Sequence, residues 1–171
     1  MHVSVQVARF NPDTDAEPRL EPWTVEVEDG ARVLNVLDAI HSRDPTLAYR
    51  SSCRAGQCGS CAVRVNGEPV LACTEEARDG MVIEPLDLPV MKDLMLDLVS
   101  GISAIPRIHT CECGILPKQE EIERIKPLRD CIECLSCVSL CPAMKVTDFL
   151  GPTSCLLYTS PSPRDRTRSR M

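Results

Sequence analysis

Two cysteine-rich stretches hold the residues of this 171-residue sequence whose types and spacing could do chemistry. The first reads R-S-S-C-R-A-G-Q-C-G-S-C over residues 50–61, and a further cysteine follows at position 73. The spacing C-x4-C-x2-C with a more distant fourth cysteine is typical of plant-type two-iron clusters. The sequence therefore predicts a [2Fe–2S] site with the ligands Cys53, Cys58, Cys61 and Cys73. A structural zinc site is the alternative for the same four thiols.

The residues between these cysteines suit an anionic cluster, whose sulfur atoms need hydrogen-bond donors. Gly56 and Gly59 let the backbone approach closely, because glycine adopts positive φ without a steric penalty. Arg50 and Arg54 could offset cluster charge or could be ordinary surface residues, and the sequence leaves both interpretations open. Cys73 follows the Asn-Gly pair at 66–67, whose tight turn would let it reach back toward the other ligands.

The second stretch, residues 131–142, reads C-I-E-C-L-S-C-V-S-L-C-P. Three cysteines at three-residue steps can hold three corners of an iron–sulfur cube. In two-cluster bacterial ferredoxins, the cysteine that precedes proline ligates the other cluster. Zinc sites use two separated cysteine pairs, so the packing of four cysteines into eleven residues favours iron and sulfide. The predicted ligands of this stretch are Cys131, Cys134 and Cys137, with Cys141 serving a different cluster.

Two further cysteines, Cys111 and Cys113, stand in the segment H-T-C-E-C-G. A C-x-C pair holds a metal poorly without partners elsewhere, and His109 is isolated. We assign neither cysteine to a cluster and expect free thiols in an irregular connection.

Composition narrows the function classes. Eleven cysteines without a secretory signal over residues 1–10 favour metal ligands over disulfides. No apolar run approaches the roughly 20 residues of a membrane-spanning helix, so membrane contact is expected only through partner subunits. A net charge of −6 disfavours nucleic acid as a partner.

The elements around the first stretch predict a small sheet with a helix across it. Alternating apolar residues over 2–10 and 23–28 predict a strand hairpin, and helical spacing over 31–41 predicts the helix. A second hairpin is predicted over 62–71 around Asn-Gly, and a closing strand over 81–84. The fold class is α+β, with a β-grasp ferredoxin-like domain over residues 1–98.

The following segments predict helices and no strands. A Met and Leu stripe after Pro89 predicts a helix over 90–98, and residues 117–126 predict a short one. Loop and helical turns are expected over 131–143. Residues 99–154 are therefore predicted to form an α-helical ferredoxin domain, incomplete in this sequence.

The last segment, residues 155–171, is basic and has no apolar periodicity. Its first residues match a translated sequencing adapter, which predicts a non-native tail on a truncated chain. A natural, disordered basic tail is the alternative. Neither interpretation gives Cys155 a place in a cluster.

The two motifs resemble the iron–sulfur subunits of succinate dehydrogenase and fumarate reductase, the complex II family. The resemblance covers nearly all of residues 1–154, including F-N-P-D-T-D-A-E-P-R-L at 10–20 and I-E-P-L-D-L-P-V-M-K-D-L at 83–94. It implies [2Fe–2S] ligation by the first four cysteines and [4Fe–4S] ligation by the next three. It also implies that Cys141 ligates a third cluster, usually [3Fe–4S]. Family members supply the remaining ligands from a downstream stretch that this sequence lacks, so only the two-iron cage is expected to close.

The resemblance implies an oxidoreductase subunit that transfers electrons and has no catalytic residue of its own. It would pass electrons between the FAD of a catalytic subunit and a quinone or thiol carrier, next to a membrane-anchor or thiol-reactive subunit. The segment C-I-E-C-L-S-C-V-S is most similar to thiol-linked fumarate reductases. Quinone-linked members carry a tryptophan shortly after the Cys-Pro pair, whereas none follows Pro142 in this sequence. The expected location is cytoplasmic, at the inner face of the plasma membrane through partner subunits. The alternatives are the iron–sulfur subunit of another flavin-linked dehydrogenase and a zinc-binding interaction module.

Overall fold

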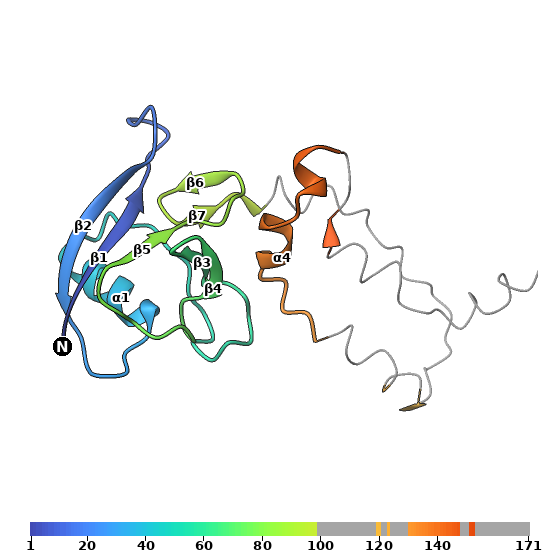
Figure 1. Cartoon of the computed structure of the whole chain (residues 1–171), viewed down its shortest axis with the longest axis horizontal. Helices are drawn as coiled ribbons and strands as arrows, with labels where there is room; N and C mark the ends of the chain where they lie inside the picture. The colour runs from blue at the N-terminus through green and yellow to red at the C-terminus, as the bar shows by residue number, and fades with distance from the viewer. Residues whose placement is uncertain (99–118, 121–122, 124–129, 148–150, 153–171) are drawn as a thin grey trace, which may run out of the picture.

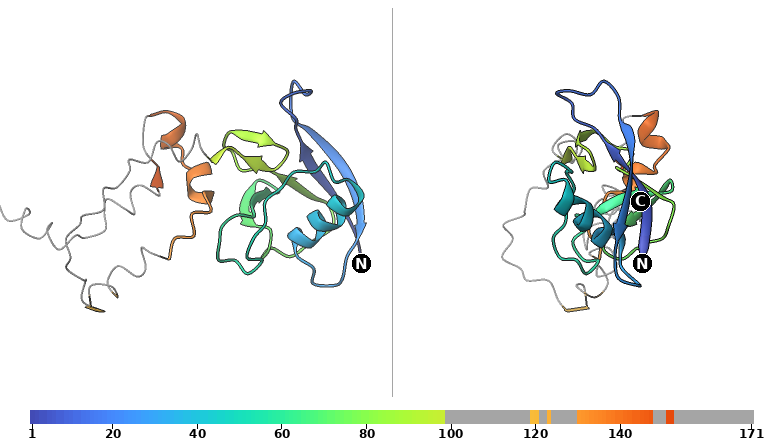
Figure 2. Two further views of the ribbon diagram at one scale, coloured as in Figure 1. Left: turned by 180° about the vertical axis from the view of Figure 1, so that it is seen from behind. Right: turned by 90° about the vertical axis from the view of Figure 1, so that its left-hand side faces the viewer.

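The structure, a computed structural model, describes residues 1–98, 119–120, 123, 130–147 and 151–152. A five-stranded sheet of order β2-β1-β5-β3-β4 carries one long helix on one face (Figures 1 and 2). Its elements are β1 (His2–Arg9), β2 (Arg19–Glu26), α1 (Val33–Arg43), β3 (Ala62–Val65), β4 (Glu68–Leu71) and β5 (Met81–Glu84). This sheet-rich α/β arrangement agrees with the predicted fold class of the N-terminal part.

The predicted first hairpin is confirmed, although its second strand is longer than expected. β1 and β2 pair antiparallel from His2 opposite Glu26 to Arg9 opposite Arg19. Pro22 lies just before the strand predicted over residues 23–28. β2 is an edge strand, where a missing N–H can face outward, so Pro22 fits opposite Gln6.

The helix α1 is confirmed and supplies most of its apolar face to the core. Its buried side chains are Val33, Leu34, Val36, Leu37 and Ile40. They pack against the alternating valines of β1, and the core continues through Val25 and Ile83 of β2 and β5. The chain leaves the helix at Asp44-Pro45, as predicted, because proline cannot continue the hydrogen-bonding pattern.

The second hairpin and the closing strand are also confirmed. β3 pairs with β4 around Asn66-Gly67, and both turn residues adopt positive φ, as a tight hairpin turn requires. β5 pairs antiparallel with β3 and parallel with β1. It therefore joins the two hairpins into one sheet.

The predicted helix over residues 90–98 is wrong. The segment forms a hairpin of β6 (Val90–Lys92) and β7 (Met95–Leu96), with Asp93 at positive φ in the turn. Leu94 and Leu96 are buried whereas Met91 is exposed, which is a two-residue alternation that a helical stripe conceals.

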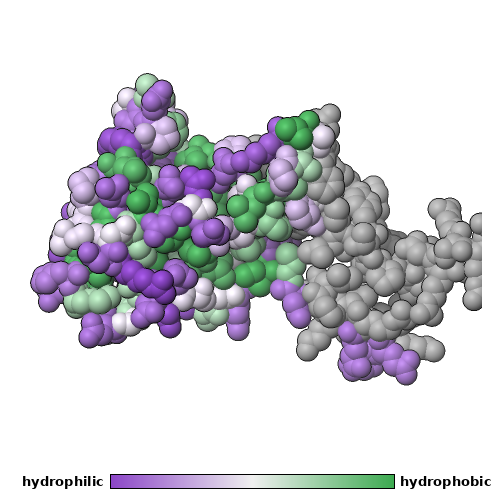
Figure 3. All heavy atoms as spheres, viewed as in Figure 1, coloured by the Kyte–Doolittle hydropathy of each residue, from purple (hydrophilic) through white to green (hydrophobic). Residues whose placement is uncertain are grey.

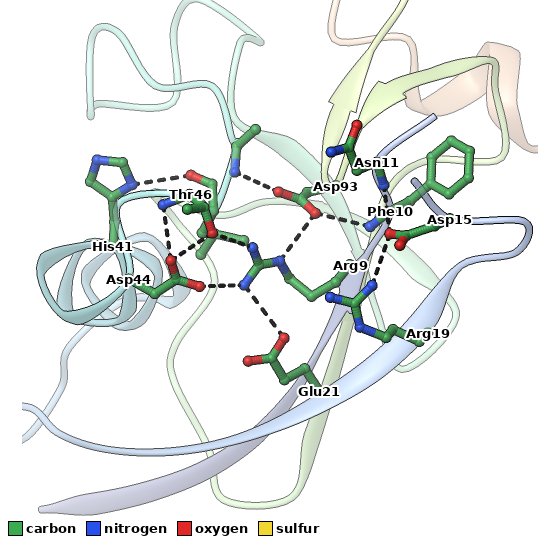
Figure 4. A network of polar contacts seen from close by, with 12 residues as sticks. Arg9, Phe10, Asn11, Asp15, Arg19, Glu21, His41, Asp44, Thr46 and Asp93 are labelled. Atoms are coloured by element: carbon green, nitrogen blue, oxygen red, sulfur yellow. Dashed lines mark hydrogen bonds and ion pairs between the residues drawn. The ribbon is translucent and has the colours of Figure 1, made fainter. Parts of the chain in front are cut away.

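The contacts of Asp93 explain why this segment forms a hairpin and not the predicted helix. Its buried carboxylate accepts hydrogen bonds from the backbone N–H of Phe10 at 2.9 Å and of Ala48 at 2.8 Å, and from Arg9 Nε at 3.1 Å (Figure 4). These partners come from the last residue of β1, from the residue that follows it and from the loop after α1, all far away in sequence. The turn is therefore fixed by tertiary contacts that local propensity does not reveal.

The second cysteine stretch forms loop and helical turns, as predicted: α4 (Ser136–Ser139) and η1 (Ala143–Lys145). α4 lies beside the β3–β4 hairpin (Figure 1). Several predicted features lie outside the described residues: Cys111, Cys113, His109 and the tail over 155–171. Of the helix predicted over 117–126, only residues 119–120 and 123 are described, and they are helical. No helix of the described part is long and apolar enough to cross a membrane.

Candidate metal centre

The sheet brings the ends of the first cysteine motif together. Cys61 immediately precedes β3, and Cys73 follows β4 after one residue. Ala62 pairs with Leu71 across the hairpin, and the N–H of Ala72 donates to the carbonyl of Cys61 at 3.0 Å. Two cysteines that are distant in sequence therefore become neighbours through strand pairing.

The loop between Cys53 and Cys61 points backbone N–H groups at sulfur atoms. Four such contacts occur: Ala55 N to Cys53 Sγ at 3.4 Å, Gln57 N to Cys53 Sγ at 3.3 Å, Gly56 N to Cys73 Sγ at 3.3 Å, and Cys53 N to Cys58 Sγ at 3.5 Å. Gly56 and Gly59 both adopt positive φ, as predicted. Donors directed at thiolate sulfur stabilise an anionic cluster, so the chemistry of this loop fits the group that the spacing predicts.

The four thiols differ in exposure, and the pKa values of two of them are shifted. Cys53 is exposed, Cys58 and Cys73 are half-buried, and Cys61 is buried in the core. Hydrogen bonds from Ser60 and from the Cys53 backbone lower the pKa of Cys58 to about 6. Burial raises the pKa of Cys61 to about 11. Metal ligands must be deprotonated, so Cys61 would have to release its proton on binding.

No group of three or more His, Cys, Asp or Glu side chains in the described residues is placed to hold one metal ion. A two-iron cluster does not require such a group, because its four cysteines are divided between two iron atoms. The N–H contacts to sulfur are the geometric feature that supports the predicted group.

Arg54 has a specific partner on the helix. Its guanidinium forms a bidentate ion pair with Asp38 of α1, with Nη1 to Oδ2 at 2.7 Å and Nη2 to Oδ1 at 3.2 Å. The hydroxyl of Tyr49 donates to the same carboxylate at 2.6 Å. Burial raises the pKa of Asp38, but the hydrogen bonds from Arg54 and Tyr49 outweigh it and leave that pKa below its usual value. Sequence reasoning missed Asp38, whose only signal was its place on a polar helix face.

The second cysteine stretch has fewer contacts. Cys131 and Cys137 are exposed, and Cys134 and Cys141 are half-buried. The Cys134 thiol donates to Ser136 Oγ at 3.3 Å, which is the only sulfur hydrogen bond among the described residues of this stretch. Glu133 and Leu135 adopt positive φ and so turn the chain sharply on both sides of Cys134.

The structure places the two motifs in direct contact at Gly59. A Cβ atom on Gly59 would lie 2.5 Å from the carbonyl oxygen of Ile132 and 2.8 Å from Cα of Cys134. Cys134 and Leu135 also pack against an apolar cluster that includes Leu86 and other residues of the N-terminal part. In Figure 3, apolar side chains gather toward the side where α4 lies. This contact was not predicted. Its signal in the sequence was Gly59, between Cys58 and Cys61, where a residue without a side chain allows another backbone to approach.

Residues 4–102 match the family model for a 2Fe-2S iron-sulfur cluster binding domain. The fumarate reductase iron-sulfur subunit of Haemophilus influenzae is 34% identical over 89% of this chain and 70% of its own length. The chain belongs to the iron–sulfur subunits of succinate dehydrogenase and fumarate reductase. The predicted family resemblance is thereby confirmed.

Two other comparisons place the chain within this family. A subunit of the fumarate reductase (CoM/CoB) of Methanothermobacter marburgensis is 46% identical over 88% of this chain and 32% of its own length. The chain thus spans about a third of that methanogen relative. A chain in the Mycobacterium smegmatis Sdh1 complex superposes with a TM-score of 0.79 at 28% identity, over 93% of this chain and 73% of that one.

Proposed function

We propose that this chain is an electron-transfer subunit that holds a [2Fe–2S] cluster with Cys53, Cys58, Cys61 and Cys73. The observation that carries the proposal is the set of backbone N–H groups directed at three of these sulfur atoms. The match to the two-iron domain family supports the same assignment. When bound, the cluster supplies one-electron transfer.

The residues of the chain position and insulate this site. The strand pair β3–β4 fixes Cys61 and Cys73, and the buried position of Cys61 anchors one side of the loop in the core. Backbone N–H groups offset negative charge on sulfur, which is one way in which a protein sets a reduction potential. Cys53 remains exposed, so the opposite side of the loop is open to an electron donor.

We further propose that residues 1–98 and 99–154 are separate ferredoxin-like domains, the second helical. Cys131, Cys134 and Cys137 would ligate a [4Fe–4S] cluster, and Cys141 a third cluster of the [3Fe–4S] or [4Fe–4S] type. The backbone contact of Gly59 with Cys134 supports a direct route between the first and second sites.

The proposed partners are an FAD-containing catalytic subunit and a membrane-anchor or thiol-reactive subunit. A polar hollow of about 700 Å³ opens beside the first cysteine loop and is lined in part by Tyr49, Arg50, Ser51, Ser52, Ser60 and Lys92. It offers the catalytic subunit a polar surface next to the exposed Cys53. The methanogen relative is named as a subunit of a fumarate reductase (CoM/CoB), which favours a thiol carrier over a quinone as the second redox partner of this chain. A cytoplasmic position at the inner membrane face, held by partners, is part of this proposal.

Anaerobic reconstitution of the chain with ferrous iron and sulfide, followed by EPR of the reduced sample, tests the cluster. We expect a rhombic two-iron signal that Cys58→Ala abolishes and that Ser42→Ala, on the exposed side of α1, leaves intact. One zinc per cysteine quartet and no signal would support a zinc-binding module instead.

The rival dehydrogenase classes are separated by the catalytic subunit. We expect the flavin subunit that copurifies with the protein to reduce the two-iron cluster with succinate. Reduction by glycolate or glycerol phosphate, and not by succinate, would assign the chain to another flavin-linked dehydrogenase.

A further inference from the structure

The side chain of Arg54 connects the first cysteine loop to helix α1. Arg54 directly follows Cys53, and its bidentate pair with Asp38 has contacts of 2.7 and 3.2 Å. The Tyr49 hydroxyl donates to Oδ1 of the same carboxylate at 2.6 Å. Three residues from α1, from the segment after it and from the cysteine loop therefore share one polar centre.

The backbone of Arg54 shows why this connection matters for the sulfur atoms. Arg54 adopts a φ of 55°, a conformation that side-chain-bearing residues keep only when their surroundings hold them. This turn directs the N–H groups of Ala55 and Gln57 back to Cys53 Sγ. Asp38 thus acts on the cysteine through Arg54.

The charges of the pair matter as well. Reduction adds one negative charge to an iron–sulfur cluster, so a nearby cation stabilises the reduced form and a nearby anion the oxidised form. Arg54 stands next to a ligand, and Asp38 offsets its charge. The side chains of Arg54 and Asp38 are 53% and 30% exposed, so salt will partly screen the effect of each charge on the reduction potential.

We propose that Asp38 is a positioning residue for the cluster: it holds Arg54 beside Cys53 and offsets its charge, so that the two partners shift the reduction potential in opposite directions. This inference rests on the proposed two-iron site. It adds a tuning residue from outside the cysteine loop, and it makes opposite predictions for the two partners of the pair.

The test is an EPR-monitored redox titration of the whole reconstituted chain. At a fixed ambient potential, we expect Asp38→Asn to raise the ratio of reduced to oxidised cluster about threefold, and Arg54→Gln to lower it about threefold. For a one-electron couple these changes are about 30 mV each, at 59 mV per tenfold change. The double variant, in which neither charge remains, should return to the wild-type ratio, and both single shifts should shrink as salt increases.

Two conservative variants separate charge from structure. Asp38→Glu keeps the carboxylate and should keep the wild-type potential, whereas Tyr49→Phe removes a hydrogen bond without changing charge and should also leave it unshifted. If Arg54→Gln does not assemble a cluster, the contrast between Asp38→Asn and Asp38→Glu decides. Shifts of equal sign in both single variants, or no shift in Asp38→Asn, would overturn the inference while the wild-type signal upholds the cluster. Absence of the wild-type signal would overturn both.

Discussion

The loop from Cys53 to Cys61 and the run from Cys131 to Cys141 carry the same kind of predicted ligand, but their backbones are held differently. The first lies between a core helix and a core strand, with Cys61 buried. Four of its backbone N–H groups reach cysteine sulfur. The second has one short helix, two exposed and two half-buried thiols, and a contact to the first through Gly59.

This difference indicates that the first site is organised by the fold before any metal binds. Burial of α1 and of the sheet determines where its cysteines lie, so the cost of ordering the loop is met by the core. The second stretch takes its described support from the surface of the first part, through the apolar cluster around Leu86 and the exposed ion pair of Lys145 with Asp87. The first region should therefore tolerate damage to the second, but not the reverse.

The largest expected effect is a loss of cluster binding confined to one region. Cys73→Ala should abolish the two-iron EPR signal after reconstitution, because the fourth ligand is lost while the half-buried position tolerates a methyl group. Cys137→Ala, at an exposed position of α4, should retain it. The measurement is the spin concentration per chain, and a signal lost in both variants would contradict the independence of the first site.

Sequence patterns predicted most of the first region because its signals are local. The alternation of Val3, Val5 and Val7, the Asn-Gly turn and the cysteine spacing each depend on residues close together in the chain. The hairpin at 90–96 was mispredicted because Asp93 is fixed by Arg9, 84 residues away. Contacts of this kind leave no periodicity in the sequence.

The candidate site shows the same division. Spacing in the sequence predicts the cysteine ligands, whereas the ion pair of Asp38 with Arg54 and the approach of Gly59 to Cys134 depend on tertiary packing. A charged residue on a helix surface and a glycine in a loop have many possible roles. Only the folded arrangement selects one.

The next effect is on the global stability of the first region. Asp93→Ala should lower the free energy of unfolding by about 3 kcal/mol, because it removes the carboxylate that faces the buried Arg9 guanidinium and two backbone N–H groups. Denaturant unfolding measures it. Asp79→Ala is the matched control: its carboxylate accepts one exposed hydrogen bond from Ser4 N at 2.7 Å, and its loss should cost less than about 1 kcal/mol. Equal costs would show that Asp93 does not anchor the hairpin.

A smaller effect concerns the contact between the regions. Gly59→Ala should displace residues 131–140, since its Cβ would overlap the Ile132 carbonyl. We expect hydrogen exchange of these amides to accelerate about tenfold, which corresponds to roughly 1.4 kcal/mol. Gly30→Ala has the same positive-φ strain at 76° with no atom within 4 Å, so it controls for strain alone. Similar acceleration in both variants would mean that strain, and not the contact, is responsible.

The smallest effect is the acid response of the network that holds the loop after α1. Hydrogen bonds from Thr46 and Arg9 keep the pKa of Asp44 well below its usual range (Figure 4). A carboxyl whose pKa is lower in the folded chain contributes stability above its unfolded pKa of about 4, and this contribution is lost as pH falls below that value. Asp44→Asn cannot lose it. Between about pH 5 and pH 3, the denaturant midpoint of the wild type should therefore fall more than that of Asp44→Asn. Parallel pH profiles would show that the ionised Asp44 carboxylate does not stabilise the first region. The buried ion pair of Arg9 with Asp93 would then be the main charged contact that stabilises it.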